Sequence, residues 1–409
     1  MKAASIVSGL VLAAVTVWVL GPGAGWILEH VDGVSVGGRT GLTGKDLADA
    51  LDAIRGRALA VATGVAALTA VFYTARNADT ARRTFQLGER GHDTDRYGKA
   101  AEQLGHAAAP VRLAGLYALE QLAQNSPALR QTVVDVICAY LRMPYDLDSS
   151  QAQEEKQVRL TAQRVLTGHL RCLLPGRRHW WQRRERPPAR FWTDIRIDLT
   201  GAVLFDLDLS MCRTSQALFT GAAFHGRADF RGAIFFGRAS FRGATFHGAA
   251  DYELAEFHAG SDFVEVAFHK RAAFVEVTFH DRARFESATF DDGVVFSDAV
   301  FELRALFTGA TVRGGANFRG ATLPAGAEFR DSVFFGDASF SQASLLAADF
   351  ADVVFHRDAQ FDEAAVALAN FSGTVFREGD PFSEGAATEA RRGWQGGRAP
   401  TGRSRRWRP

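Results

Sequence analysis

Residues 219–268, FTGAAFHGRADFRGAIFFGRASFRGATFHGAADYELAEFHAGSDFVEVAF, place an aromatic residue at alternating steps of five and six. The same period continues to Phe382 and fills 31 positions, of which 26 are Phe. The other five are Tyr252, Val312, Leu323, Leu345 and Val366. Because the whole chain of 409 residues has 32 Phe, this one pattern uses most of them. A short fixed period indicates a solenoid, in which each unit buries its side chains by stacking on its neighbours.

A second row of small residues accompanies the aromatic row. Ala239 lies two positions before Phe241, and Val266 lies two positions before Phe268. Alternate side chains of an extended chain point to the same face, so each unit is predicted to bury two side chains. The other positions are mainly charged residues, His, Gly, Ser and Thr, which suit an outer wall. Upstream the same arrangement follows strict steps of five, at Leu199, Leu204, Leu209, Thr214 and Phe219.

These units resemble the pentapeptide-repeat proteins over residues 197–382. The resemblance implies a right-handed, four-sided β-helix with one unit on each side. Alternating steps of five and six imply about 22 residues in a coil, compared with about 20 for strict fives. The 35 inward positions from Leu199, taken four to a coil, predict roughly eight or nine coils. Consecutive fives at 340–355 and 361–376 leave the coil register open there.

Residues 1–77 are of a different kind, and we expect two transmembrane helices with a connector. The stretch 3–28 carries no charge, and its first part, to residue 20, is strongly apolar. A second uncharged run, 58–75, lies between two arginines. About 20 apolar residues cross a bilayer as a helix, so the two runs predict a helical hairpin in the membrane. The alternative is that the first run is a cleaved signal peptide, because it follows a charged N-terminus.

Residues 78–171 are predicted to form a small helical domain. Apolar residues recur at spacings of three and four from Val111 to Leu122, which is typical of an amphipathic helix. Asn125-Ser126-Pro127 indicates a helix end and a new start, with Ser126 as the N-cap. Paired short helices of this kind resemble a HEAT-like or armadillo-like unit. The segments 94–105 and 111–120 also resemble a part of membrane-anchored actinobacterial pentapeptide-repeat proteins, and 42 Arg against 5 Lys agrees with a GC-rich genome.

The net charge of +1 hides a strong segregation along the chain. Residues 1–196 carry +7, residues 197–382 carry −11 and residues 383–409 carry +5. Two basic segments rich in Arg and Trp, a linker at 172–196 and a disordered tail at 383–409, suit contact with anionic lipid. The acidic rod raises an alternative function, because some pentapeptide-repeat proteins are thought to imitate DNA and so inhibit or protect a DNA topoisomerase. Nucleic acid itself is not an expected partner.

The orientation in the membrane rests on basic residues and cysteines. Five basic residues lie beyond the outer ends of the two runs and four lie between them, which slightly favours both ends inside the cell. The three cysteines, Cys138, Cys172 and Cys212, have no framework spacing, which suits a reducing compartment. We therefore expect a two-span protein of the cell membrane with most of the chain in the cytoplasm.

A row of histidines follows the aromatic positions at a spacing of eleven. At about 22 residues to a coil, alternate members lie on opposite sides of the rod. Stacked imidazoles can bind a transition metal, but no carboxylate or thiol recurs at a fixed spacing to complete a site. The sequence therefore predicts no metal ligand, although it leaves metal binding by the row open. One side holds His225, His247 and His269, and the other holds His258 and His280.

Enzyme motifs are missing from the sequence. It contains no H-E-x-x-H and no G-x-S-x-G, and residues 41–45 fail as a phosphate loop because Asp46 replaces the required Ser or Thr. The sequence predicts no catalytic residue, no cofactor-binding residue and no cofactor. We expect a membrane-anchored, non-catalytic scaffold that presents a β-helical rod to a protein partner, whose identity the sequence leaves open.

Overall fold

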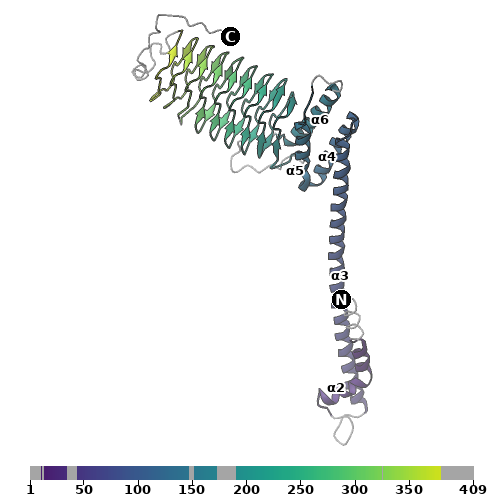
Figure 1. Ribbon diagram of the computed structural model, residues 1–409. Coiled ribbons are helices and arrows are strands. Elements are labelled where there is room, and N and C mark those ends of the chain that lie inside the picture. Colours follow the sequence, from purple (N-terminus) through teal and green to yellow (C-terminus); the bar gives the residue numbers. More distant parts are fainter. Residues whose placement is uncertain are drawn as a thin grey trace. The chain divides into compact units, whose positions relative to one another are not determined.

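The computed structural model describes residues 11, 13–34, 44–146, 152–172, 190–324 and 326–378, and for 77–92 it describes the backbone alone. The chain divides into two compact units, Met1–His92 and Asp93–Pro409. The first unit contains α2 and most of α3, and the second contains α4, α5, α6 and the stacked strands (Figure 1).

The N-terminal unit contains a π-helical turn and two helices: η1 (Val19–Gly23), α2 (Ala24–His30) and the first part of α3 (Gly44–Leu104). The chain leaves helical dihedrals at Gly21, directly before Pro22, whose ring opposes a regular helix. The segment before the connector and the start of α3 pack side by side around a small apolar core. That core consists of Val19, Ala24, Leu28 and Ile54.

One helical segment among the described residues is long and apolar enough to cross a membrane. It is Gly44–Arg76, of 33 residues, and its apolar window is not buried against any described part of the chain. This segment contains the second predicted span, 58–75. Half of the first predicted span, 3–20, lies outside the described residues, namely 3–10 and 12. One candidate span is therefore found, and the second span, the signal-peptide alternative and the orientation stay predictions.

Helix α3 is continuous across the predicted domain boundary at residue 77. The segment 44–104 contains no proline, so nothing removes a backbone donor from the helical ladder. Its last residues, from Asp93, belong to the second unit.

The second unit begins with a layer of short helices after α3: α4 (Ala109–Asn125), the 3₁₀ turn η2 (Pro127–Leu129), α5 (Arg130–Arg142) and α6 (Ala152–Leu170). The predicted helix end at Asn125 is confirmed. Ser126 lies at the N-cap position of η2 with Pro127 in the first turn, as predicted, but its side chain makes no capping hydrogen bond. Its hydroxyl donates to Asp93 Oδ2 at 2.6 Å, because that carboxylate lies within reach and the chain re-enters helix through η2.

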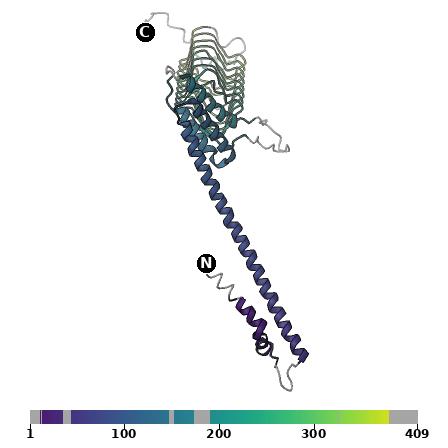
Figure 2. The ribbon, with the colours of Figure 1, turned by 90° about the vertical axis from the view of Figure 1, so that its right-hand side faces the viewer.

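Residues 196–376 form a parallel β-solenoid of about eight coils with four faces, which confirms the predicted β-helix (Figures 1 and 2). We number the faces I to IV in chain order. Face I contains β1 (Arg196–Asp198), β4 (Gln216–Leu218), β8 (Ala239–Ser240), β12 (Ser261–Asp262), β16 (Ala283–Arg284) and β20 (Ala305–Leu306). Face II contains β2 (Val203–Phe205), β5 (Ala223–His225), β9 (Thr245–Phe246), β13 (Ala267–Phe268), β17 (Thr289–Phe290), β21 (Thr311–Val312), β23 (Val333–Phe334), β25 (Val354–Phe355) and β27 (Val375–Phe376).

The other two faces complete each coil. Face III contains β6 (Ala228–Asp229), β10 (Ala250–Asp251), β14 (Ala272–Ala273), β18 (Val294–Val295), β22 (Ala316–Asn317), β24 (Ala338–Ser339) and β26 (Ala359–Gln360). Face IV contains β3 (Arg213–Thr214), β7 (Ile234–Phe235), β11 (Glu256–Phe257), β15 (Thr278–Phe279) and β19 (Val300–Phe301). Faces II and IV are therefore opposite each other, as are faces I and III.

The strand register gives the length of each coil. On face II, Val203 pairs with Ala223, which is a coil of 20 residues, and Ala223 pairs with Thr245, which is a coil of 22. Near the end Val354 pairs with Val375, a coil of 21. The predicted 22-residue coil is confirmed for the middle of the stack. The consecutive fives left open by the sequence shorten a coil by one residue without breaking the ladder, because the residue is lost at a corner.

The aromatic row forms the dry centre of the solenoid. Every inward position from Leu199 to Phe371 is at most 4% exposed. Rings stack along each face, as Phe224 and Phe246 do with centroids 4.2 Å apart and planes 3° apart. Rings from different faces, both neighbouring and opposite, meet edge to face, which the ring quadrupole favours. The predicted inward orientation is thereby confirmed for the described repeats.

The helical layer covers the first coil of the solenoid (Figure 2). Two glutamines replace the missing strand neighbours at this edge. The amide of Gln163 in α6 both donates to and accepts from the backbone of Phe205 in β2, at 2.6 and 3.0 Å. Gln131 in α5 does the same for Arg196 in β1, at 2.9 and 3.0 Å. Unpaired strand edges promote association with other chains, and the helices thus close this edge.

The strand edge at the start of face IV is also covered by backbone pairing. Arg171 forms an antiparallel bridge with Cys212, and the amide of Cys172 donates to the carbonyl of Met211 at 3.0 Å. The helices and the solenoid share one continuous apolar core. The end of the predicted basic linker belongs to that core, since Trp192 is fully buried and stacks on His169 at 3.9 Å. Residues 173–189 of the linker and the tail at 383–409 lie outside the described residues.

Candidate functional site

The outer rows of the four faces differ in charge. Each strand exposes the residue before its inward aromatic, and the strand register places these residues in straight rows. On face II this row contains nine uncharged residues: Val203, Ala223, Thr245, Ala267, Thr289, Thr311, Val333, Val354 and Val375. We call it the uncharged row. It offers a long flat strip whose burial by a partner would require no removal of water from a charge.

Faces I and III carry ion pairs between coils. On face III, Arg227 pairs with Asp251 of the next coil at 2.9 Å, and Asp229 pairs with Arg231 of its own coil at 2.6 Å. On face I, Arg330 pairs with Asp349 at 2.7 Å. Burial opposes ionisation of Asp349, but the amide of Ala351, Arg330 and the amide group of Asn370 together lower its pKa. Many of the acidic side chains on these faces are therefore matched locally by arginine.

The histidines lie where the sequence places them, in two outer columns. On face II, His225 and His247 stack with ring centroids 4.5 Å apart, and His247 and His269 follow at 5.4 Å. Burial, together with the charges of His247 and Lys156, lowers the pKa of His225. His269 Nδ1 lies 2.7 Å from Asp291 Oδ2, which continues the column in the next coil.

The opposite column, on face IV, includes a carboxylate. His258 and His280 stack at 4.5 Å, and Glu256 Oε2 lies 3.1 Å from His258 Nε2. Each of these three side chains can offer one ligand atom, and the three atoms lie within 4.8 Å of one another. Sequence reasoning missed this carboxylate because it occurs in one coil and has no period. Its position two residues before His258, on the same strand face, was the available signal.

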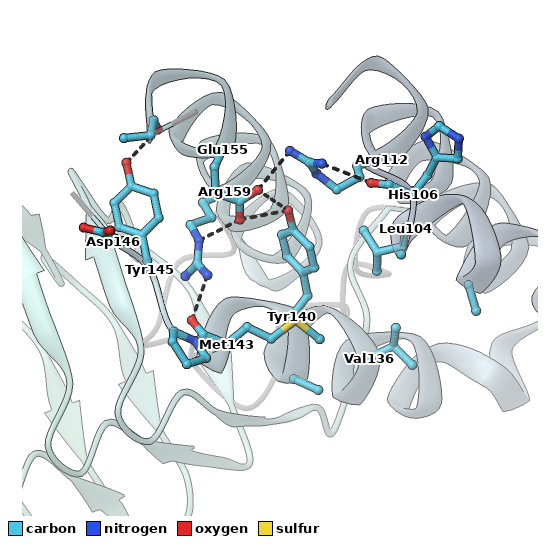
Figure 3. Close-up of a pocket in the computed structure, with 15 residues that line it drawn as sticks. Leu104, His106, Arg112, Val136, Tyr140, Met143, Tyr145, Asp146, Glu155 and Arg159 are labelled. Carbon is cyan, nitrogen blue, oxygen red and sulfur yellow. Dashed lines mark hydrogen bonds and ion pairs between the residues drawn. The ribbon is translucent and has the colours of Figure 1, made fainter. Parts of the chain in front are cut away.

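The helical layer contains a pocket of about 550 Å³ between α4, α5 and α6 (Figure 3). Glu155 lies at its centre and binds Arg112 at 3.1 Å, Arg159 at 2.9 Å and the hydroxyl of Tyr140 at 2.8 Å. Arg159 is 1% exposed and also donates to the carbonyls of Leu141 and Met143. These carbonyls end α5, so the guanidinium caps that helix.

Glu155 forms ion pairs with Arg112 and Arg159 and accepts a hydrogen bond from Tyr140, so these four side chains interact with one another. Burial and the hydrogen bond to Glu155 raise the pKa of Tyr140, so its hydroxyl stays protonated at neutral pH. Arg112 additionally donates to the carbonyls of His106 and Ala107, at 3.0 and 2.6 Å. Within the group of Arg112, Tyr140, Glu155 and Arg159 there is neither a free general base nor an activated nucleophile. Its geometry is that of a structural network.

Cys138 and Cys212 offer no reactive thiolate. All three cysteines are buried and none forms a disulfide. Burial raises the pKa of Cys138 to about 12 and that of Cys212 to about 12. Thiols in such surroundings are protonated and inert, because the thiolate is the reactive form.

The four-faced parallel stack with a filled aromatic centre defines a β-solenoid repeat protein. Comparison with protein families gives a match to "Pentapeptide repeats (9 copies)" at residues 214–253 and 296–344. The solenoid of this chain is therefore built of pentapeptide repeats. No curated protein and no solved structure matches the chain. Such solenoids are generally non-enzymatic scaffolds.

Proposed function

We propose that the protein is a membrane-anchored, non-catalytic rod that binds a protein partner through face II. The observation that carries the proposal is the uncharged row, which is in register over nine strands, while the corresponding rows on faces III and I contain the ion-paired carboxylates Asp251 and Asp349. Within face II, the uncharged row itself offers a partner small apolar and hydroxyl side chains, and the column beside it carries His269, Asp291 and Arg313 as ion pairs between coils. A partner that covers face III must break or bury ion pairs, which costs free energy.

Crosslinking from matched positions tests the binding face. A photo-reactive amino acid is introduced at Thr289 in the uncharged row, or at Asn317 on face III, both of which are half-buried strand positions. We expect a specific crosslinked partner in the native cell from position 289 and none from position 317. Equal crosslinking from both positions, or crosslinking from 317 alone, would contradict the assignment to face II.

Membrane anchoring is the second part of the proposal, and the segment Gly44–Arg76 supports it. Large apolar side chains along it, including Val61, Leu68 and Phe72, are exposed. In water this surface would be unfavourable by about 25 cal/mol for each Å². We expect the full chain to stay in the membrane fraction after an alkaline wash. The double variant Val61→Arg, Leu68→Arg should move to the soluble fraction, since charges at the centre of a span are costly.

Orientation needs introduced cysteines, because the native thiols are buried and cannot report exposure. Asp49 and Lys270 are both exposed. Asp49 precedes the predicted span 58–75, and Lys270 lies on the solenoid. With both ends inside, Asp49→Cys should react with an impermeant maleimide in intact cells. Lys270→Cys should react only after the cells are opened. The reverse pattern would place the rod outside.

The alternative, imitation of DNA toward a topoisomerase, is favoured by no specific observation. Imitation of a phosphate backbone requires rows of unmatched negative charge. Several carboxylates on the rod are instead paired with arginines of the same or a neighbouring coil, as Glu328 is with Arg304 at 3.1 Å.

A further inference from the structure

We infer that Glu256, His258 and His280 on face IV form a binding site for a divalent transition-metal ion. Two imidazoles and one carboxylate are a donor set that suits Zn²⁺, Ni²⁺ or Cu²⁺. The three side chains come from two adjacent coils. Glu256 and His258 flank Phe257 in β11, and His280 follows Phe279 in β15 directly above it.

The parallel register produces the convergence. Alternate residues of a strand share a face, so Glu256 and His258 both point outward from β11. Phe257 pairs with Phe279, which places His280 over His258 with ring centroids 4.5 Å apart. The potential ligand atoms of the three residues lie within 4.8 Å of one another. Small rotations of exposed side chains bring such atoms to the separation that a shared ion needs.

A neighbouring carboxylate orients His280. Its Nδ1 lies 3.0 Å from Glu302 Oε1 in the next coil. With the ring proton on Nδ1, His280 donates a hydrogen bond to Glu302, and the lone pair on Nε2 is left for a metal. Metal-binding histidines commonly have such a carboxylate on the other nitrogen, where it fixes the ring and strengthens the ligand. Glu302 is therefore a positioning residue in this site.

The surroundings limit the site to one part of the column. Phe236 stacks on the lower side of His258 at 5.4 Å, so the column ends in an apolar ring there. The residue in register with Glu256 in the next coil is Thr278, which carries no charge. Three donors leave further coordination positions for water or for a side chain of a partner.

The face II column provides an internal comparison. His225, His247 and His269 stack in the same way, but the strand positions that correspond to Glu256 are Ala223, Thr245 and Ala267. That column therefore has no carboxylate at the strand positions that correspond to Glu256, and its contact between His269 and Asp291 at 2.7 Å corresponds to that between His280 and Glu302. The comparison predicts preferential metal binding on face IV.

Calorimetric titration tests the inference. The full-length chain is purified in mild detergent with a histidine-free tag and stripped of metal. Zn²⁺ should bind with one site whose affinity falls at least about tenfold in His258→Ala and in His280→Ala. Glu256→Gln, which keeps the shape of the side chain, should also weaken binding. The matched variant His247→Ala on face II should bind as the wild type does.

Spectroscopy with Cu²⁺ identifies the ligands directly. Electron paramagnetic resonance of the wild type should show coupling to imidazole nitrogen that is lost in His280→Ala and retained in His247→Ala. All four positions are partly or fully exposed, so unchanged melting curves will show that each variant folds. The inference would be overturned if the wild type did not bind zinc, or if His258→Ala and His280→Ala left zinc binding unchanged. Loss of zinc binding in His247→Ala would also overturn it.

Discussion

At the scale of single residues, each inward aromatic holds three coils together. Phe274 is fully buried and stacks at 4.7 Å on Tyr252 below and on Phe296 above. We expect Phe274→Asp to lower the free energy of unfolding by at least about 4 kcal/mol, since it removes the ring and buries a carboxylate without a partner. Thermal melting and limited proteolysis measure the loss.

The matched control is Leu368→Asp on the same solenoid. Leu368 is 84% exposed, so its replacement should change the melting temperature little. If Phe274→Asp melted and resisted protease as the wild type does, the aromatic centre would not be the source of stability.

Two corner glycines that look alike in the sequence have different constraints. A Cβ added at Gly248 would overlap the carbonyl of Gly226 in the coil below, whereas one added at Gly260 meets nothing closer than 3.9 Å. Neither glycine has a positive φ, so backbone strain does not separate them. We expect Gly248→Ala to cost about 1–3 kcal/mol and Gly260→Ala to be nearly neutral in denaturant unfolding. Equal effects would show that coils are not in close contact at Gly248.

At the scale of elements, the helices end the solenoid by hydrogen bonding as well as by packing. Gln163 satisfies the buried amide and carbonyl of Phe205, while Gln131 serves the more exposed Arg196. We expect Gln163→Leu to cost about 2–4 kcal/mol, because two buried backbone groups lose their partners. Gln131→Leu should cost less, since water can replace its amide. Hydrogen exchange at the Phe205 amide and thermal melting report both changes.

If α5 and α6 covered this edge by packing alone, loss of the glutamine amide group would not lower stability. Leucine preserves most of the volume of glutamine, so Gln163→Leu would then be neutral or stabilising. The paired variants therefore separate the two contributions of α5 and α6 to the edge of the stack.

At the scale of the whole molecule, periodicity explains what the sequence could and could not predict. The aromatic centre and the histidine rows follow from a repeated spacing, which is visible without a structure, and the four faces follow from the resemblance of that repeat to pentapeptide-repeat proteins. The glutamine pairing at Phe205, the burial of Trp192 and the approach of Glu256 to His280 each occur once. Trp192 in particular resembled part of a basic linker, because its neighbours in sequence are charged and its contacts lie far along the chain.

The division into two units yields a prediction about the whole chain. The core of residues from Asp93 onward is continuous from the helices through the solenoid, and the small core around Val19 and Ile54 is separate. We expect a chain of residues 93–409 to be soluble and to melt within a few degrees of the full-length protein in detergent. A chain of 173–409 should aggregate, because it lacks α4, α5 and α6 and exposes the edges of β1 and β2. Size-exclusion chromatography and circular dichroism compare the two. Equal behaviour of both chains would mean that the solenoid closes its own first coil, and aggregation of 93–409 would mean that its core depends on the N-terminal unit.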